Sequence, residues 1–213
     1  MSQDTNENCF DKAAKTWDEK PRRIELANAV SKSIKSLLPL QPNMKAMEYG
    51  CGTGLVSIAL SPFLKHITAV DNSTKMLEVL EEKLQSYNIE NITPKSLDLT
   101  EPSINLTTHR YDLIFTSMTL HHIPDVATLI KRFYEILLPK GWLAIADLDK
   151  EDGDFHEPSI QVPHHGFERK ELEALLQKNG FSNIKTTTAH EIKKEVTGGV
   201  IKTFPVFLMI GQK

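Results

Sequence analysis

Apolar side chains recur along the chain with two alternating periods, which predict the order of its helices and strands. After Pro21, apolar residues follow at helical spacing until Pro39 stops the run. Short apolar runs typical of strands then cover residues 44–49, 66–70, 92–97, 111–117 and 142–147, and helical patterns lie over 55–60, 73–87 and 124–138. Strands that alternate with helices are typical of a parallel sheet covered by helices on both faces.

The C-terminal third follows a different pattern. A polar segment over 148–166 precedes a helical pattern over 168–179, and strands over 184–195 and 200–210 meet near Gly198 and Gly199. Because these two strands are contiguous, we expect them to pair antiparallel. We predict one α/β domain over 1–213, with a helical cap (1–40), a core (41–150), a lid loop (148–166) and a C-terminal helix and hairpin (167–213).

Three glycines stand directly after the first predicted strand. Gly50, Gly52 and Gly54 let the backbone turn into the next helix and approach a ligand that a Cβ would hold away. The turn presents free backbone N–H groups at the carboxyl edge of the sheet, where ligands of α/β proteins bind. A tight turn without any ligand is the alternative.

Acidic residues at the same predicted edge favour a ligand. Asp71 ends the second strand, where it could accept both hydroxyls of a ribose, and Asp98 after the third strand could accept from an exocyclic amine. Glu48, just before the first glycine, suits a ligand that carries positive charge and would repel a pyrophosphate.

Charge and composition narrow the class of protein. The net charge of −3 and the pI of about 6.2 make a nucleic-acid partner unlikely, because sequence-independent binding of that kind needs a basic surface. No apolar run is long enough for a membrane span. With two cysteines, Cys9 and Cys51, and a polar N-terminus, the sequence predicts a protein of the reducing cytoplasm.

Several stretches together resemble class I S-adenosylmethionine-dependent methyltransferases. In the family's order they are EYGCGTG (48–54), VDNS (70–73), LDL (97–99), YDLIF leading to LHHIP (111–124) and LPKGW (138–142). The combination is specific for the cofactor and unspecific for the substrate. The chain is similar to the small-molecule branch, which includes ubiquinone and menaquinone methyltransferases.

The resemblance implies S-adenosyl-L-methionine as the cofactor and a Rossmann-like, doubly wound, mostly parallel seven-stranded sheet with an antiparallel C-terminal strand. Glu48 would help to hold the methionine ammonium, and Asp71 would take the ribose hydroxyls. The other residues that it places at the cofactor are Gly50, Cys51, Gly52, Gly54, Asn72, Met76, Asp98, Leu99 and Thr116.

The candidate catalytic residues are His121 and His122, which follow the fourth strand. A sulfonium methyl is already reactive, so the enzyme chiefly has to position the acceptor, and it needs a base only where the acceptor carries a proton. Histidine titrates near neutral pH and could take that proton. Packing of one ring, with a nitrogen bonded to the backbone, is the alternative.

A second titratable group lies in the lid loop: Asp147, Asp149, Asp152, Asp154, His156, His164 and His165. These side chains include metal-ligand types. The spacing is not that of an EF-hand, because the glycine falls at position 7 from Asp147 instead of 6. We favour a solvated acidic loop that closes over the substrate, and we predict no metal.

Phe10 and Trp17 could close over the cofactor or could simply anchor the N-terminal helix to the sheet. Three other functions stay open beside a small-molecule methyltransferase. They are a nucleic-acid or protein methyltransferase, a non-catalytic protein that binds the cofactor, and a nicotinamide oxidoreductase. The last is disfavoured by the glycine spacing, which is G-x-G-x-G and not G-x-G-x-x-G. The oligomeric state is left open.

Overall fold

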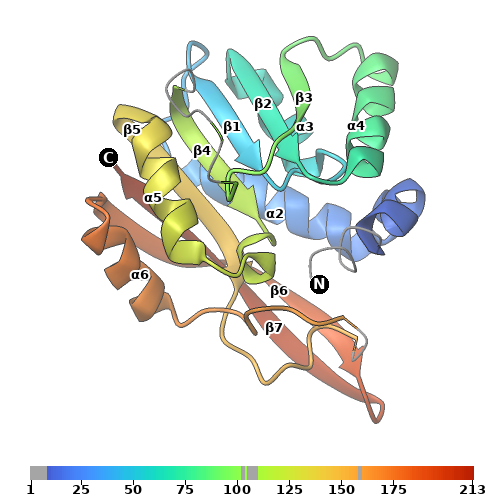
Figure 1. Cartoon of the computed structure of the whole chain (residues 1–213). Helices are drawn as coiled ribbons and strands as arrows, with labels where there is room; N and C mark the ends of the chain where they lie inside the picture. Colours follow the sequence, from blue (N-terminus) through green and yellow to red (C-terminus); the bar gives the residue numbers. More distant parts are fainter. Residues whose placement is uncertain (1–8, 102–103, 105–109, 158–159) are drawn as a thin grey trace.

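One seven-stranded sheet runs through the whole protein (Figure 1). The computed structural model describes residues 9–101, 104, 110–157 and 160–213. Residues 1–8 of the predicted cap and 158–159 of the predicted lid therefore lie outside the described residues. The elements are η1 (Ala14–Glu19), α2 (Pro21–Leu37), β1 (Lys45–Tyr49), α3 (Leu55–Leu60), η2 (Ser61–Phe63), β2 (His66–Asp71), α4 (Thr74–Ser86), β3 (Ile92–Ser96), β4 (Tyr111–Ser117), η3 (Leu120–His122), α5 (Val126–Ile136), β5 (Leu137–Leu148), α6 (Arg169–Lys178), β6 (Ser182–Val196) and β7 (Val200–Gln212).

The strand order is β3-β2-β1-β4-β5-β7-β6. Strands β1 to β5 pair in parallel, whereas β7 lies between β5 and β6 and is antiparallel to both. This arrangement confirms the predicted Rossmann-like fold and its inserted C-terminal strand. The carboxyl ends of β1, β2, β4 and β5 therefore meet at one edge, which is where the site is built.

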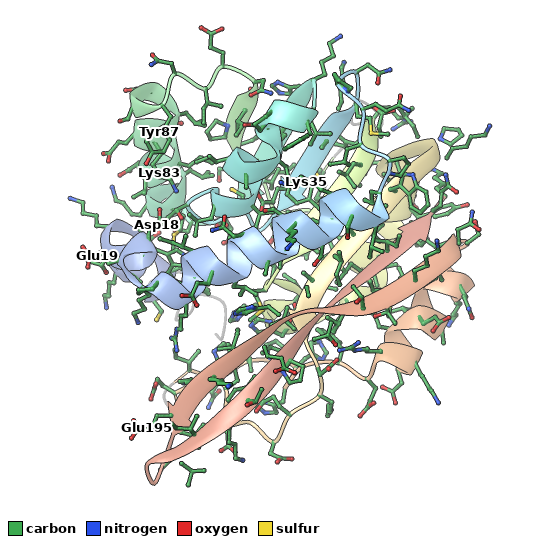
Figure 2. All side chains as sticks on the ribbon, turned by 180° about the vertical axis from the view of Figure 1, so that it is seen from behind. Asp18, Glu19, Lys35, Lys83, Tyr87 and Glu195 are labelled. Carbon is green, nitrogen blue, oxygen red and sulfur yellow. The ribbon has the colours of Figure 1, made fainter. Side chains whose placement is uncertain are left out.

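Two hydrophobic layers cover the sheet. Alternate residues of β1 point to opposite faces: Ala46 packs into the layer under α2, α3 and α4, and Met47 into the layer under α5. Figure 1 shows α5 and α6 in front of the sheet, and Figure 2, from behind, shows α2 running across the opposite face. Burial on both faces is the reason that the parallel strands read as continuous apolar runs.

The structure differs from the sequence prediction at the fifth strand. β5 begins at Leu137, where the pattern predicts the end of a helix, and includes Pro139, Lys140 and Gly141. Leu137 pairs with Tyr111, after which the register shifts so that Trp142 pairs with Leu113. The four residues between Leu137 and Trp142 form an irregularity within the strand, and Lys140 there has a φ of 66°.

The segment between β5 and α6 returns to the end of its own strand. Phe167 N donates to Leu148 O (2.9 Å), and Lys150 N donates to Phe167 O (3.1 Å). Gly166, with φ +68°, lies so close to the strand that an added Cβ would sit 2.1 Å from the carbonyl oxygen of Asp149. This close backbone approach fixes where the loop leaves the sheet edge.

We expect Gly166→Ala to destabilise the protein by more than Gly198→Ala. Both positions have positive φ, which costs an alanine about 1–2 kcal/mol, but Gly198 (φ +94°) has nothing within 4 Å of an added Cβ. At Gly166 the backbone also has to move, for roughly 1–3 kcal/mol more. Urea unfolding of both variants measures the difference, and equal losses would show that the contact with Asp149 is not restrictive.

Candidate functional site

The backbone of the glycine loop is held by the end of the neighbouring strand. Gly50 N and Cys51 N both donate to Val70 O (2.8 and 2.9 Å), and Gly52 N donates to Asp71 Oδ2 (2.7 Å). Gly52 has φ +52°, and no described residue beyond its two chain neighbours lies within 4 Å of an ideal Cβ there. At this position no described side chain covers the main-chain atoms of the loop, so a ligand can lie flat against them.

Asp71 holds three backbone groups at once. Its Oδ1 accepts from Ser73 N (2.9 Å) while its Oδ2 accepts from Gly52 N, and burial raises its pKa. The backbone of Asn72 is a third hydrogen-bond donor to this carboxylate. The two oxygens offer about four lone-pair sites in all, which leaves capacity for a donor from a ligand. Ser73 also caps α4, because its Oγ accepts from Met76 N (3.2 Å), as its position before the helical pattern predicts.

Glu48 is 2% exposed and lies under the loop. Its Oε2 accepts from Ser57 N (3.0 Å) and from Ser57 Oγ. Burial raises the pKa of Glu48 to about 8, against these two bonds, which lower it. In the free protein Glu48 is therefore largely protonated near neutral pH, and its predicted contact with a methionine ammonium stays a prediction.

The remaining predicted cofactor residues line the same edge. Asp98 accepts from Tyr49 Oη (3.2 Å) and from Thr100 N and Oγ1 (both 2.7 Å). Asn72 is exposed between β2 and α4, whereas Met76 of α4 and Leu99 after β3 are buried (2% and 0% exposed). The Oγ1 of Thr116, at the end of β4, is buried and has no hydrogen-bond partner among the described residues.

Cys51 is buried, and its Sγ donates to Gly52 O (3.5 Å). Burial, followed by the charges of Asp71 and Glu48, raises the pKa of the thiol well above its usual value. The thiol stays neutral at neutral pH, so it is not poised as a nucleophile.

His121 and Asp147 form a buried pair at the ends of β4 and β5. His121 is 1% exposed and Asp147 is 0% exposed, and their Nδ1 and Oδ1 atoms are 2.6 Å apart. Asp147 Oδ2 also accepts from His121 N (3.3 Å), and its Oδ1 from Leu148 N (2.7 Å). Because an ionised carboxylate only accepts, Nδ1 is the donor, and in the neutral form of the ring the lone pair is then on Nε2.

This pair lies next to the glycine loop. Thr119, two residues before His121, donates from Oγ1 to Gly50 O (3.3 Å). An added Cβ at Gly50 would sit 2.2 Å from that same Oγ1. The segment that carries the histidines is therefore pressed against the loop, and the missing side chain of Gly50 makes this possible.

The N-terminal segment lies on the same edge. Asp18 accepts from Thr53 Oγ1 (2.6 Å) and pairs with Lys83 (2.7 Å), and Asp11 accepts from Ser73 Oγ (2.6 Å). Figure 2 shows Asp18 next to Lys83 on α4. Closure of this segment over a cofactor stays a prediction.

The acids of the loop after β5 are used in ion pairs. Asp149 binds Arg169 through two bonds (2.6 and 2.7 Å), and Asp154 pairs with Lys202 of β7. Glu151 accepts from the backbone N–H groups of residues 153, 154 and 155. These three carboxylates are therefore held by the protein, and no local sequence pattern indicates their partners, which lie on α6, on β7 and in the loop itself.

A family model of a methyltransferase domain matches residues 22–186. The chain belongs to this methyltransferase family. The match confirms the predicted family and, with it, the prediction of a methyltransferase whose cofactor is S-adenosyl-L-methionine.

Two curated relatives and one solved structure are similar to this methyltransferase. An uncharacterized methyltransferase of Schizosaccharomyces pombe is 31% identical over 153 residues, which are 66% of this chain and 54% of the relative. A carboxy-S-adenosyl-L-methionine synthase of Shewanella denitrificans is 26% identical over 178 residues, 78% of this chain and 72% of the relative. The chain thus spans about half the length of the yeast relative.

The solved structure is phosphoethanolamine N-methyltransferase 2 of Haemonchus contortus, in complex with phosphomonomethylethanolamine and S-adenosylhomocysteine. It has a TM-score of 0.67 at 16% identity and covers 86% of this chain and 52% of its own. This likeness supports the fold of the methyltransferase. Among the described residues, the helices are all too short or too polar to cross a membrane.

We expect the methyltransferase to lose stability relative to its Glu48→Gln variant as the pH rises from about 5 to about 8. In this range the unfolded carboxyl, with its usual pKa of 4.5, has released its proton, while the folded one, with a pKa of about 8, still holds it. Unfolding therefore becomes easier as the pH rises, up to the folded pKa, and the effect then levels off.

Thermal unfolding at several pH values measures this difference. Glu78→Gln, at an exposed carboxylate on α4, is the control and should follow the wild type. A constant gap between Glu48→Gln and the wild type across the range would contradict the raised pKa.

Proposed function

We propose that this protein transfers the methyl group of S-adenosyl-L-methionine to a small-molecule acceptor, with His121 at the acceptor. The observation that carries the proposal is the buried His121–Asp147 pair, which borders the glycine loop through Thr119. It brings an oriented imidazole to the edge where the family binds its cofactor.

The residues at the edge fit the cofactor in three ways. The open space over Gly52 accommodates a ligand against bare backbone, and the free lone pairs of Asp71 suit ribose hydroxyls. The unpartnered Oγ1 of Thr116 is a buried polar atom that a ligand can satisfy. We assign the cofactor to Glu48, Gly50, Cys51, Gly52, Gly54, Asp71, Asn72, Met76, Asp98, Leu99 and Thr116.

When bound, the cofactor would supply a methyl group on a positively charged sulfur, from which a lone pair of the acceptor could displace a neutral thioether. His121 Nε2 takes the proton of an O–H or N–H acceptor, and Asp147 stabilises the resulting imidazolium. His122 packs against Phe10, with ring centroids 5.2 Å apart, and helps to exclude water from this side.

Two features support a small-molecule acceptor over a nucleic acid. The net charge of −3 does not favour a phosphate backbone. One relative, at 26% identity, is named for a small-molecule product, carboxy-S-adenosyl-L-methionine. That name also describes a reaction other than methyl transfer to a separate acceptor, so the product has to be identified directly.

The test of the activity is incubation of the protein with methyl-labelled cofactor and a metabolite extract, followed by identification of the labelled product. We expect a labelled small molecule and release of S-adenosylhomocysteine. Label in RNA or protein would overturn the small-molecule acceptor. Binding of the cofactor without any labelled product would favour the non-catalytic alternative, and binding of NAD in its place would favour an oxidoreductase.

We expect Asp71→Ala to weaken binding of S-adenosylmethionine by more than about tenfold, since a charge-assisted hydrogen bond contributes roughly 1.5–3 kcal/mol. The control is Asp112→Ala, which also removes a carboxylate that accepts a backbone N–H, from Lys45 at 2.8 Å, but at the opposite end of the strands. Calorimetry measures both dissociation constants. An unchanged constant for Asp71→Ala would remove this residue from the cofactor site.

We expect His121→Ala to slow methyl transfer by roughly 10²–10⁴-fold, the usual contribution of a general base, and to leave cofactor affinity close to the wild type. His121→Asn is the second variant, because its amide can still donate to Asp147 but cannot take a proton. Single-turnover rates and calorimetry separate the two effects. Turnover equal to the wild type would exclude His121 from the chemistry.

A further inference from the structure

Three histidine side chains from two distant segments meet at the carboxyl edge of the sheet. His121 and His122 come from η3, and His156 comes from the loop after β5. One ring nitrogen from each lies within 4.8 Å of the others. The ring centroids of His121 and His156 are 5.1 Å apart, and those of His122 and His156 are 5.3 Å apart.

Two nitrogens of this group are enclosed without a partner. His122 Nδ1 and His156 Nε2 are buried and make no hydrogen bond with the described residues. A buried polar atom left unsatisfied costs about 1–3 kcal/mol. Two such atoms on neighbouring rings are therefore a costly arrangement unless a ligand satisfies both.

The third histidine is already oriented as a metal ligand would be. Asp147 accepts from His121 Nδ1 at 2.6 Å, so the lone pair of this ring is on Nε2. Histidines that bind metals commonly donate their other nitrogen to a carboxylate, which fixes the ring and makes it more basic. Phe10 and Phe155 pack edge-on against His122 and His156 (5.2 and 5.1 Å) and add an apolar shell.

We propose that His121, His122 and His156 bind one divalent transition-metal ion of the zinc type, with Asp147 as the carboxylate behind His121. Three protein nitrogens leave a fourth position of a tetrahedral site open, as in catalytic zinc sites. A zinc–nitrogen distance of roughly 2.0–2.1 Å places tetrahedral ligands about 3.4 Å apart.

The local charges are compatible with a cation. The carboxylate of Asp147, 2.6 Å from His121 Nδ1, places a negative charge next to the three rings. Burial lowers the pKa of His156, the charges of His121 and His165 lower it further, and so does that of Lys194. The Nζ of Lys194 donates to Phe155 O (2.7 Å) and lies 3.3 Å from Glu157 Oε1, which offsets its charge.

This proposal departs from the sequence prediction of no metal. That prediction treated the aspartates and histidines of the loop, His156 among them, as one group without a metal; in the structure Asp149 pairs with Arg169 and Asp154 with Lys202. The histidines are brought together only by the fold. Metal binding stands independently of methyl transfer, but the role of the metal in turnover rests on the proposed function. With Nε2 of His121 bound to the metal, this histidine could not take the proton of the acceptor. The ion would instead bind the acceptor hydroxyl and lower its pKa.

The experiment is a titration of chelator-treated protein with Zn²⁺ by calorimetry, and with Co²⁺ by visible absorption. We expect one equivalent of metal per chain and the absorption of a low-coordinate cobalt ion. His156→Ala should weaken Zn²⁺ binding by more than tenfold, since loss of even an outer partner costs roughly 10–100-fold. His165→Ala is the matched control, because this histidine lies in the same loop with its side chain 51% exposed and outside the cluster.

Absence of stoichiometric binding, or equal affinity in His156→Ala and His165→Ala, would overturn the metal site. Calorimetry with S-adenosylmethionine on the same chelator-treated protein keeps the two proposals apart. If the cofactor binds and methyl transfer proceeds without metal, only the metal's role in turnover fails. If Zn²⁺ binds at the histidines and no methyl transfer occurs, only the proposed function fails.

Discussion

The site depends on one constraint, the attachment of the loop after β1 to the end of β2. Val70 O accepts two N–H groups of this loop and Asp71 accepts a third, so three consecutive backbone donors are fixed by one neighbouring strand. Such an arrangement requires positive φ at residues 50 and 52, which glycine adopts without strain. It also places Gly50 against Thr119, and through Thr119 the loop determines where η3 and its histidines lie.

Much of this architecture could be predicted from the sequence, because burial on both faces gives parallel strands an uninterrupted apolar pattern. The positions of Glu48, Asp71 and Asp98 at one edge followed from the ends of those strands. The start of β5 could not be predicted in this way. Pro139 and Gly141 usually end a helix, and only the pairing of Leu137 with Tyr111 shows that the strand begins before them.

The chemistry of the edge was less predictable than its location. Tyr49, which donates to Asp98, reads in the sequence as the last apolar residue of a strand. In the sequence, nothing distinguishes His156 from the other titratable residues of the loop. Its approach to His121 requires that the loop folds back over the sheet. Asp147 carries no sequence signal that distinguishes a partner of histidine from a solvated strand end. Contacts between segments far apart in the chain decide these roles, and no local pattern encodes them.

The distribution of charge at the edge favours a cationic ligand. Burial raises the pKa values of both Glu48 and Asp71, and the charge of Asp71 raises that of Glu48 further. The nearest ammonium, Lys83, is held by Asp18 and by Thr53 O (2.7 Å each). A ligand that brings an ammonium and a sulfonium would therefore lower both pKa values on binding, whereas a pyrophosphate would raise them. The same electrostatics that destabilise the two carboxylates in the free protein thus select for the positive charge of the family's cofactor. After methyl transfer the product is a neutral thioether with one positive charge less, so its attraction to these carboxylates is weaker.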